Sequence, residues 1–179
     1  MSATVTTAET KQQRPRRRWM SWPLMLAVLV AAIATGWWVR GNVLGSYRVE
    51  SGSMRPTLCA GDQVLVDKRV EGPDLKHDDL VVLNSPDDGT LVVKRVVGLP
   101  GDRVAIRDAL LFVDGKRVRE PYVDHKAIDA LFYGPEVVPK DSVLVMGDDR
   151  ASSIDSRDYG AVPFSEVQGT VMLRWWSGC

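Results

Sequence analysis

The sequence "LVVKRVVGLPGD", residues 91 to 102, predicts a β-strand that ends in a tight loop. Its first part is rich in β-branched valines, and its last part carries the glycines and the proline of a turn. Lys94 and Arg95 stand in the middle of the run, and strand alternation sends their side chains to opposite faces. One of these two cations must therefore point toward the side shared with Val92 and Val96.

Similar short runs follow and precede this one. They read "QVLVDK", "DLVVLN", "DRVAIRD", "LLFVDGKRV", "DSVLVMGD" and "GTVMLRWW". The Asp-Gly pair inside "VDGKRV" is a strong hairpin signal, and no helical apolar period persists in this part of the chain. Residues 119 to 140 are the least regular, and we expect them to form a surface excursion. The sequence thus predicts a mainly β domain built from antiparallel sheet.

An apolar segment precedes this domain. From Trp19 to Val39 the chain has 21 residues without a charged side chain, which is long enough to cross a hydrocarbon core of about 30 Å as a helix. Four tryptophans lie at its ends, as is typical of membrane interfaces: Trp19, Trp22, Trp37 and Trp38. The alternative is a cleavable secretory signal, because small residues occur near the end of the run, but its apolar region is longer than such signals usually have.

The flanking charges predict the orientation of this helix. Five basic residues precede the apolar run, whereas Arg40 stands alone after it, and an excess of basic residues marks the cytoplasmic side. We expect a basic cytoplasmic tail at 1–18, a transmembrane helix at 19–39, a linker at 40–46 and an extracytoplasmic β-rich domain at 47–179. The predicted location is the plasma membrane, crossed once.

The charge balance of the exported part excludes one class of partner. Residues 1–40 hold 6 of the 23 Lys and Arg and 1 of the 23 Asp and Glu, which leaves a net charge of about −5 on the remainder. A nucleic-acid partner is not expected, because it would need a basic surface. Cys59 and Cys179, with two distant histidines, lack the spacing of a metal site, so we expect no metal and no cofactor. The two cysteines are compatible with one disulfide or with two free thiols.

The segment "ESGSMRPTL", residues 50 to 58, offers serines in a turn that Gly52 and Pro56 shape. A serine becomes a nucleophile only when a base accepts its proton. The chain has two histidines and no "GxSxG" motif, so a Ser-His-Asp triad has little support. Lys94, with its apolar neighbours, is the best candidate base, since burial favours a neutral amine. The alternative is a lysine on the solvated face of an edge strand.

Four segments, taken in order, resemble the motifs of the type I signal peptidases of bacteria. They are "SGSMRPTL" at 51–58, "GDQVLVDK" at 61–68, "KRVVGLPGD" at 94–102 and "MGDDRASSIDSRDYG" at 146–160. The resemblance implies a membrane-anchored serine endopeptidase with Ser53 as nucleophile and Lys94 as general base. It also implies that exported preproteins are cut after small-residue, Ala-x-Ala-like sites.

The same resemblance implies supporting roles. Ser153 matches the residue that orients the lysine amine, and Ser51 matches a hydroxyl that joins the oxyanion hole in some members. Asp155 and Arg157 match a structural ion pair beneath the site. The supporting turn is expected to contain Asp148 and Arg150.

Four apolar residues are candidates for lining the substrate pocket: Met54, Leu58, Val92 and Val93. Ordinary core packing is the alternative role for Met54 and Leu58. Two residues depart from the family pattern: Asp149, where asparagine is usual, and Glu50.

The expected partners are exported preproteins and membrane lipid, with the secretion translocon as a further candidate. Trp175 and Trp176 are candidates for contact with the membrane interface, although strand alternation places one of them in the core.

Two other functions remain open at this point. One is a specialised Ser-Lys maturation peptidase of the pilus or conjugation type; the related self-cleaving repressors are soluble, so the apolar segment argues against them. The other is a membrane-tethered β module that binds partners without catalysis.

Overall fold

The computed structural model describes residues 22–70, 72–125 and 132–177. The chain divides into two compact units, residues 1–36 and 37–179. The predicted basic tail, residues 1–18, lies outside the described residues, as do Trp19 and Cys179.

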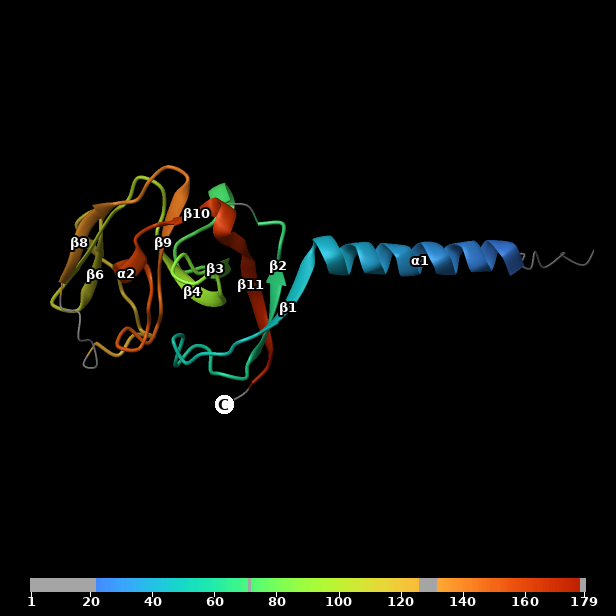
Figure 1. The fold of residues 1–179 in the computed structure, drawn as a ribbon, viewed down its shortest axis with the longest axis horizontal. Coiled ribbons are helices and arrows are strands. Elements are labelled where there is room, and N and C mark those ends of the chain that lie inside the picture. Colours follow the sequence, from blue (N-terminus) through green and yellow to red (C-terminus); the bar gives the residue numbers. More distant parts are fainter. Residues whose placement is uncertain (1–21, 71, 126–131, 178–179) are drawn as a thin grey trace, which may run out of the picture. The chain divides into compact units, whose positions relative to one another are not determined.

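Helix α1, Trp22–Asn42, contains most of the predicted membrane segment (Figure 1). Its window Trp22–Val39 is long and apolar enough to cross a membrane, and none of that window is buried. Most of the predicted linker, residues 40–46, belongs to a helix or a strand in the structure. Residues 40–42 continue the helix, and strand β1, Leu44–Arg48, begins two residues later because it pairs along its full length with β2.

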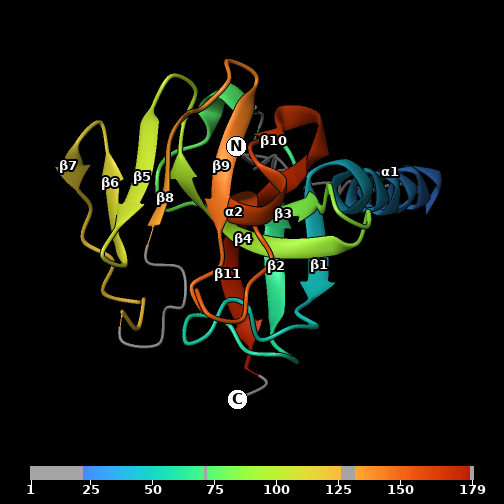
Figure 2. The ribbon, with the colours of Figure 1, turned by 60° about the vertical axis from the view of Figure 1, so that its left-hand side comes forward.

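A seven-stranded sheet forms the larger part of the second unit, in the order β1-β2-β11-β3-β4-β9-β10 (Figures 1 and 2). Its remaining strands are β2 (Gln63–Asp67), β3 (Leu80–Asn84), β4 (Leu91–Gly98), β9 (Ser142–Met146), β10 (Val162–Pro163) and β11 (Val167–Trp176). Neighbouring strands are antiparallel throughout. Lys94 lies on β4, which has β3 and β9 as its neighbours, so the candidate base lies on an interior strand of the sheet.

A second sheet has four strands in the order β7-β6-β5-β8. These are β5 (Arg103–Arg107), β6 (Leu110–Val113), β7 (Lys116–Arg117) and β8 (Phe132–Val137), again antiparallel. The predicted hairpin is confirmed between β6 and β7, where Asp114 and Gly115 take the positive φ values of 52° and 74° that such a turn requires. The predicted mainly β, antiparallel fold with one N-terminal apolar helix is therefore confirmed.

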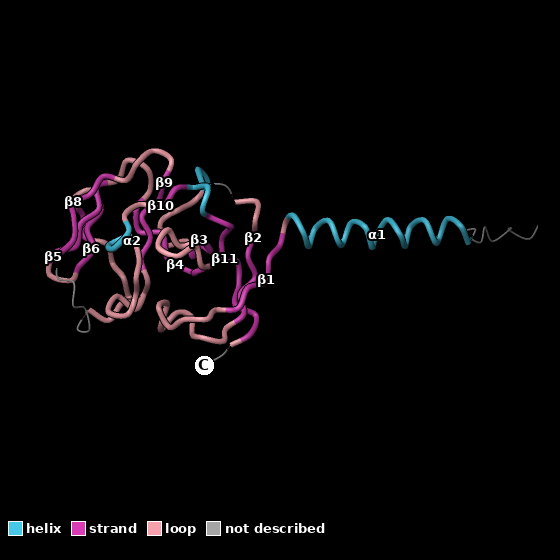
Figure 3. The backbone as a smooth tube through the Cα atoms, viewed as in Figure 1, coloured by secondary structure: helices cyan, strands magenta, loops and turns pink. Residues whose placement is uncertain are grey.

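Valines and leucines from both sheets fill three main core clusters. The first includes Met54 and Val93, and the second gathers around Val81 and Val96. Three short helical turns complete the fold, η1 (Gly72–Asp74), α2 (Ser156–Tyr159) and η2 (Phe164–Glu166) (Figure 3). Of these, α2 follows directly on the last sequence motif and helps to position it.

One expectation about the core is wrong. Trp175 and Trp176 are 53% and 63% exposed, so neither lies in the core. At this end β11 pairs with β2 through a bulged register. In the segment 119–140, most described residues are exposed or half-buried, as expected of a surface excursion, but the segment also contains the buried Glu120 and strand β8.

Candidate active site

Ser53 lies in a turn whose backbone is closed by local hydrogen bonds. The Arg55 N–H donates to the Gly52 carbonyl (3.0 Å), and the Leu58 N–H donates to the Met54 carbonyl (2.9 Å). Ser53 itself is buried, whereas Ser51 is exposed, and their hydroxyl oxygens lie 3.2 Å apart. The two serines thus form a pair of hydroxyls at the edge of the first core cluster.

Lys94 is 3% exposed and makes a hydrogen bond through its amine. Its Nζ donates to the Ser153 hydroxyl over 2.7 Å. Burial lowers the pKa of Lys94, because removal of water disfavours the charged form. The charge of Asp155 opposes this shift and that of Arg157 supports it, and the net pKa remains below the ordinary lysine value. A fixed amine with a lowered pKa is suited to accept a proton.

Gly147 brings Ser53 and Ser153 to one place. A β-carbon at Gly147 would lie 2.3 Å from the Ser153 hydroxyl oxygen and 2.6 Å from the Ser53 carbonyl oxygen. Both distances are too short for a real contact, so only glycine fits there. Asp149, two residues after Gly147, donates its backbone N–H to the same Ser53 carbonyl (3.0 Å). The turn after β9 therefore packs the serine turn against the residue that holds the lysine.

Asp155 and Arg157 form an ion pair beside this turn. Arg157 Nε donates to Asp155 Oδ1 (2.8 Å), and Arg157 Nη2 donates to Asp155 Oδ2 (2.9 Å). Burial alone would raise the pKa of Asp155, but the hydrogen bonds and charge of Arg157 outweigh it and lower that pKa. Asp155 also caps α2 and accepts a hydrogen bond from the Gly147 N–H (2.9 Å). The pair thus fixes the backbone on which Ser153 stands.

Asp148 pairs with Arg95, the neighbour of Lys94 in β4. Arg95 donates from Nε and Nη2 to the two carboxylate oxygens of Asp148, over 2.8 and 2.7 Å. Both side chains are buried, and Thr57 donates its hydroxyl to the same carboxylate. Asp148 therefore joins the strand of Lys94, the turn of Gly147 and the loop that follows Ser53.

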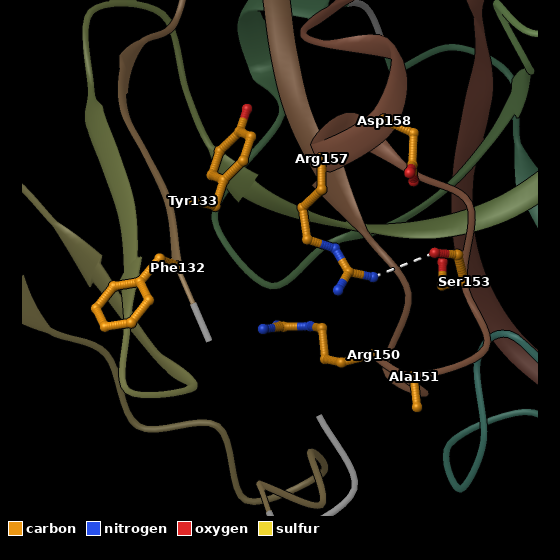
Figure 4. Close-up of a pocket in the computed structure, with 7 residues that line it drawn as sticks. All are labelled: Phe132, Tyr133, Arg150, Ala151, Ser153, Arg157 and Asp158. Carbon is orange, nitrogen blue, oxygen red and sulfur yellow. Dashed lines mark hydrogen bonds between the residues drawn. The ribbon is translucent and has the colours of Figure 1, made fainter. Parts of the chain in front are cut away.

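Arg150 pairs with Glu120 and is also buried. It lines a cavity of about 320 Å³ together with Ser153 and Arg157, and Figure 4 shows both guanidinium groups directed into this space. The dashed contact in Figure 4 is the hydrogen bond from Arg157 Nη2 to the Ser153 carbonyl oxygen (3.2 Å). Arg150 and Arg157 thus reach the Ser153 segment from two sides.

The four candidate pocket residues do not lie together. Met54, Leu58 and Val93 are buried in the first core cluster, which fits the core-packing alternative. Val92 is half-buried and packs against the second cluster, because it points to the opposite face of β4 from Val93. Of the two departures from the family pattern, Glu50 is exposed, and Asp149 serves the site through its backbone.

Several contacts of the site were not predicted from the sequence. In the sequence, Arg95 stands out only as the neighbour of Lys94. No motif indicates a role for Glu120, Tyr122 or Thr57. The Tyr122 ring stacks on the Arg95 guanidinium, with Cζ 3.8 Å from the ring centroid. Gly147 offered one signal, since glycine is the residue that a tight turn or a close backbone approach favours.

Metal chemistry finds no support in the described ranges. Among residues 22–70, 72–125 and 132–177, no group of three His, Cys, Asp or Glu side chains is placed to hold a metal ion. Cys59 is disulfide-bonded, which favours the disulfide alternative over free thiols. The chain has one other cysteine, Cys179, outside the described residues.

Comparison with known proteins gives a consistent result. Residues 17–176 match the family described as signal peptidase, peptidase S26. Signal peptidase I of Bacillus caldolyticus is 39% identical over 183 residues, covering 93% of this chain and 94% of that protein. Signal peptidase I T of Bacillus subtilis (strain 168) is 33% identical over 177 residues, covering 92% of this chain and 89% of that protein.

A crystal structure of a signal peptidase I from Enterococcus faecalis V583 aligns with a TM-score of 0.47 and 29% sequence identity, covering 54% of this chain and 95% of that one. The family match spans most of the chain, and the relatives align along nearly their whole length. The chain therefore belongs to the signal peptidase family, peptidase S26, and is a serine peptidase.

Proposed function

We propose that this chain is a membrane-anchored endopeptidase that removes signal peptides from exported preproteins with a Ser53–Lys94 dyad. The observation that carries the proposal is the state of Lys94, whose buried amine has a lowered pKa and donates to Ser153 over 2.7 Å. A lysine that only covered a surface would keep its charge in water. The packing of Gly147 against both Ser153 and the Ser53 backbone supports a shared site.

In the proposed reaction, Ser53 Oγ attacks the carbonyl carbon of the scissile peptide bond, and Lys94 Nζ takes the hydroxyl proton. The tetrahedral intermediate collapses, the C–N bond breaks, and Lys94 returns the proton to the leaving amine. A water molecule then attacks the Ser53 ester, again with Lys94 as base, which frees the signal peptide. Ser153 keeps the amine oriented through both steps, as the third member of a catalytic triad does.

The negative charge of the intermediate needs hydrogen-bond donors. The Ser53 N–H and the Ser51 hydroxyl are the proposed donors, since the two serine oxygens lie 3.2 Å apart. One donor aimed at the developing charge contributes roughly 3 kcal/mol to the transition state. Ser51 is exposed before substrate binds, so its hydroxyl is free to turn toward the substrate.

The proposed substrate is an extended segment with small side chains, of the Ala-x-Ala type. Such a segment can bind as an added strand, with backbone hydrogen bonds for affinity and shallow pockets for selection. Helix α1 suits the role of a single membrane anchor because its apolar window is wholly unburied. The excess of basic residues before it supports the proposed orientation, with the N-terminus in the cytoplasm and the β domain outside.

Membrane lipid and the secretion translocon are the partners that this location implies. A specialised Ser-Lys maturation peptidase would use the same site on a narrower set of substrates. Both enzymes need Ser53 and Lys94, whereas a binding module would need neither.

The test uses the full chain in detergent with a preprotein that carries an Ala-x-Ala site. We expect one cut after that site, lost in Ser53→Ala and retained in Ser152→Ala, which changes an exposed serine of the neighbouring turn. Cleavage of a pilin-type precursor alone would favour the specialised peptidase. Full activity of Ser53→Ala would refute the proposal.

A further inference from the structure

Two side chains from one short segment, "EPY" at 120–122, contact buried arginines of the candidate site, Arg150 and Arg95. The first is Glu120, whose carboxylate pairs with Arg150 in a fully buried contact. Arg150 Nε in turn donates to the Gly147 carbonyl over 2.9 Å. Glu120 therefore fixes the direction of the guanidinium that holds the Gly147 peptide.

The second side chain is Tyr122, whose ring covers the guanidinium of Arg95 at 3.8 Å from Cζ to the ring centroid. Its hydroxyl donates to Asp78 Oδ1 over 2.8 Å, which fixes the ring in place. Arg95 donates to both oxygens of Asp148 and to the Asp78 carbonyl. The Tyr122 ring thus covers one face of the Arg95 guanidinium, whose N–H groups already donate to Asp148 and to the Asp78 carbonyl.

Both contacts end at the same turn. Arg150 holds Gly147 by its carbonyl, and Arg95 holds Asp148 by its side chain. The following residue, Asp149, binds the Ser53 carbonyl through its N–H. A shift of this turn would therefore move the Ser53 backbone relative to Ser153, and with it the hydroxyl that orients Lys94.

We propose that Glu120 and Tyr122 are positioning residues for the reaction, acting through Arg150 and Arg95 to set the place of the turn 147–150. This inference rests on the proposed Ser53–Lys94 mechanism. Neither residue reaches the reacting atoms; each keeps a buried arginine in one geometry. Catalysis is sensitive to such placement, because a displacement of about 1 Å can lower the rate roughly 100-fold.

Glu120→Gln and Tyr122→Leu test the two contacts separately. Glu120→Gln keeps the side-chain size but leaves the buried Arg150 charge without its counter-charge, and Tyr122→Leu removes the ring without changing any charge. Tyr122→Phe keeps the ring over Arg95 and loses only the hydroxyl bond to Asp78, so this variant should keep its activity. The matched control is Phe112→Leu, which removes the other arginine–aromatic stack of the described residues, that of Arg107 at 5.7 Å.

Kinetics are measured on the full chain in detergent, at a temperature where circular dichroism shows each variant to be folded. We expect kcat to fall roughly 10- to 100-fold in Glu120→Gln and Tyr122→Leu, with KM changed less than about threefold. Tyr122→Phe and Phe112→Leu should keep kcat within about threefold of the unmodified chain. If Tyr122→Leu does not fold, Glu120→Gln still tests the proposal.

The pH profile of kcat/KM distinguishes positioning from mere stability. The charged groups that act on Lys94 are Asp155, Arg157 and Asp158, and Tyr122→Leu changes none of them. A looser turn admits water to the amine and weakens the desolvation that lowers the Lys94 pKa. We therefore expect the profile of Tyr122→Leu to move to higher pH.

Ser53→Ala separates this inference from the proposed function. If Ser53→Ala stays active, the proposed function is wrong. If Ser53→Ala is inactive while Glu120→Gln and Tyr122→Leu keep both kcat and the pH profile, the function stands and the positioning role is wrong.

Discussion

Gly147→Ala adds a single carbon atom at the point where the two halves of the site meet. The new β-carbon would start 2.6 Å from the Ser53 carbonyl oxygen and 2.3 Å from the Ser153 hydroxyl oxygen. Ordinary contacts begin near 3.4 Å, so the serine backbone must move by about 0.8 Å and the hydroxyl by about 1.1 Å. Such shifts would weaken the 3.0 Å hydrogen bond from Asp149 to Ser53 and the 2.7 Å hydrogen bond from Lys94 to Ser153.

Since misplacement of this size costs roughly 100-fold in rate, we expect Gly147→Ala to lower kcat/KM by about that factor. The assay is cleavage of a signal-peptide substrate by the full chain in detergent, with thermal unfolding recorded on the same samples. Gly36→Ala is the control, because its β-carbon on helix α1 would meet nothing within 4 Å. A folded Gly147→Ala variant with unchanged kcat/KM would refute the reasoning, since the two serines would then tolerate separation.

Four further outcomes are expected. Ser51→Ala should lower kcat roughly 100-fold, less than Ser53→Ala, in a comparison of initial rates; equal loss in both would contradict the donor role. The kcat/KM of the unmodified chain should fall in acid and rise through an ionisation below the ordinary lysine pKa, and Lys94→Arg should be inactive at every pH. Because the native pKa of Lys94 is lowered, the unfolded chain binds more protons at every pH between the native and the unfolded pKa, and the native chain is destabilised below both; Lys94→Met should therefore unfold at a higher temperature than the unmodified chain below the native pKa and lose this advantage as the pH rises to ~10.4. Asp148→Ala leaves the buried Arg95 unpaired and should reduce the free energy of unfolding by about 3–5 kcal/mol in a denaturant titration.

The sequence allowed correct prediction of elements that carry their own local signal. The strand around Lys94 is bounded by turn residues, and the hairpin at Asp114 and Gly115 needs only the positive φ that these residues tolerate. Strand β8 gave no such signal, because "FYGPEV" contains a glycine and a proline that usually mark loops. Its strand conformation comes from pairing with β5, a partner distant in sequence.

The candidate site also contains residues with a local sequence signal and residues whose contacts depend on distant parts of the chain. Ser53 and Lys94 stand in ordered motifs that can be recognised one after another. Glu120 lies 30 residues from Arg150 in sequence, and Tyr122, in an irregular segment, lies 27 residues from Arg95 (122 − 95). Neither contact leaves a periodic or motif signal, since each depends on where the folded chain returns. For this reason the expected surface excursion at 119–140 gave no sign of the buried Glu120 within it.

The charges around Lys94 explain how a carboxylate can lie near the proposed general base while the pKa of that base stays lowered. Asp155 taken alone would raise the Lys94 pKa and keep the amine protonated. Arg157 binds both oxygens of that carboxylate and lowers the Lys94 pKa by its own charge. The two effects oppose each other, so burial of the amine determines the direction of the shift. The Asp155–Arg157 pair therefore supports the backbone of Ser153 while the pKa of Lys94, the proposed base, remains lowered.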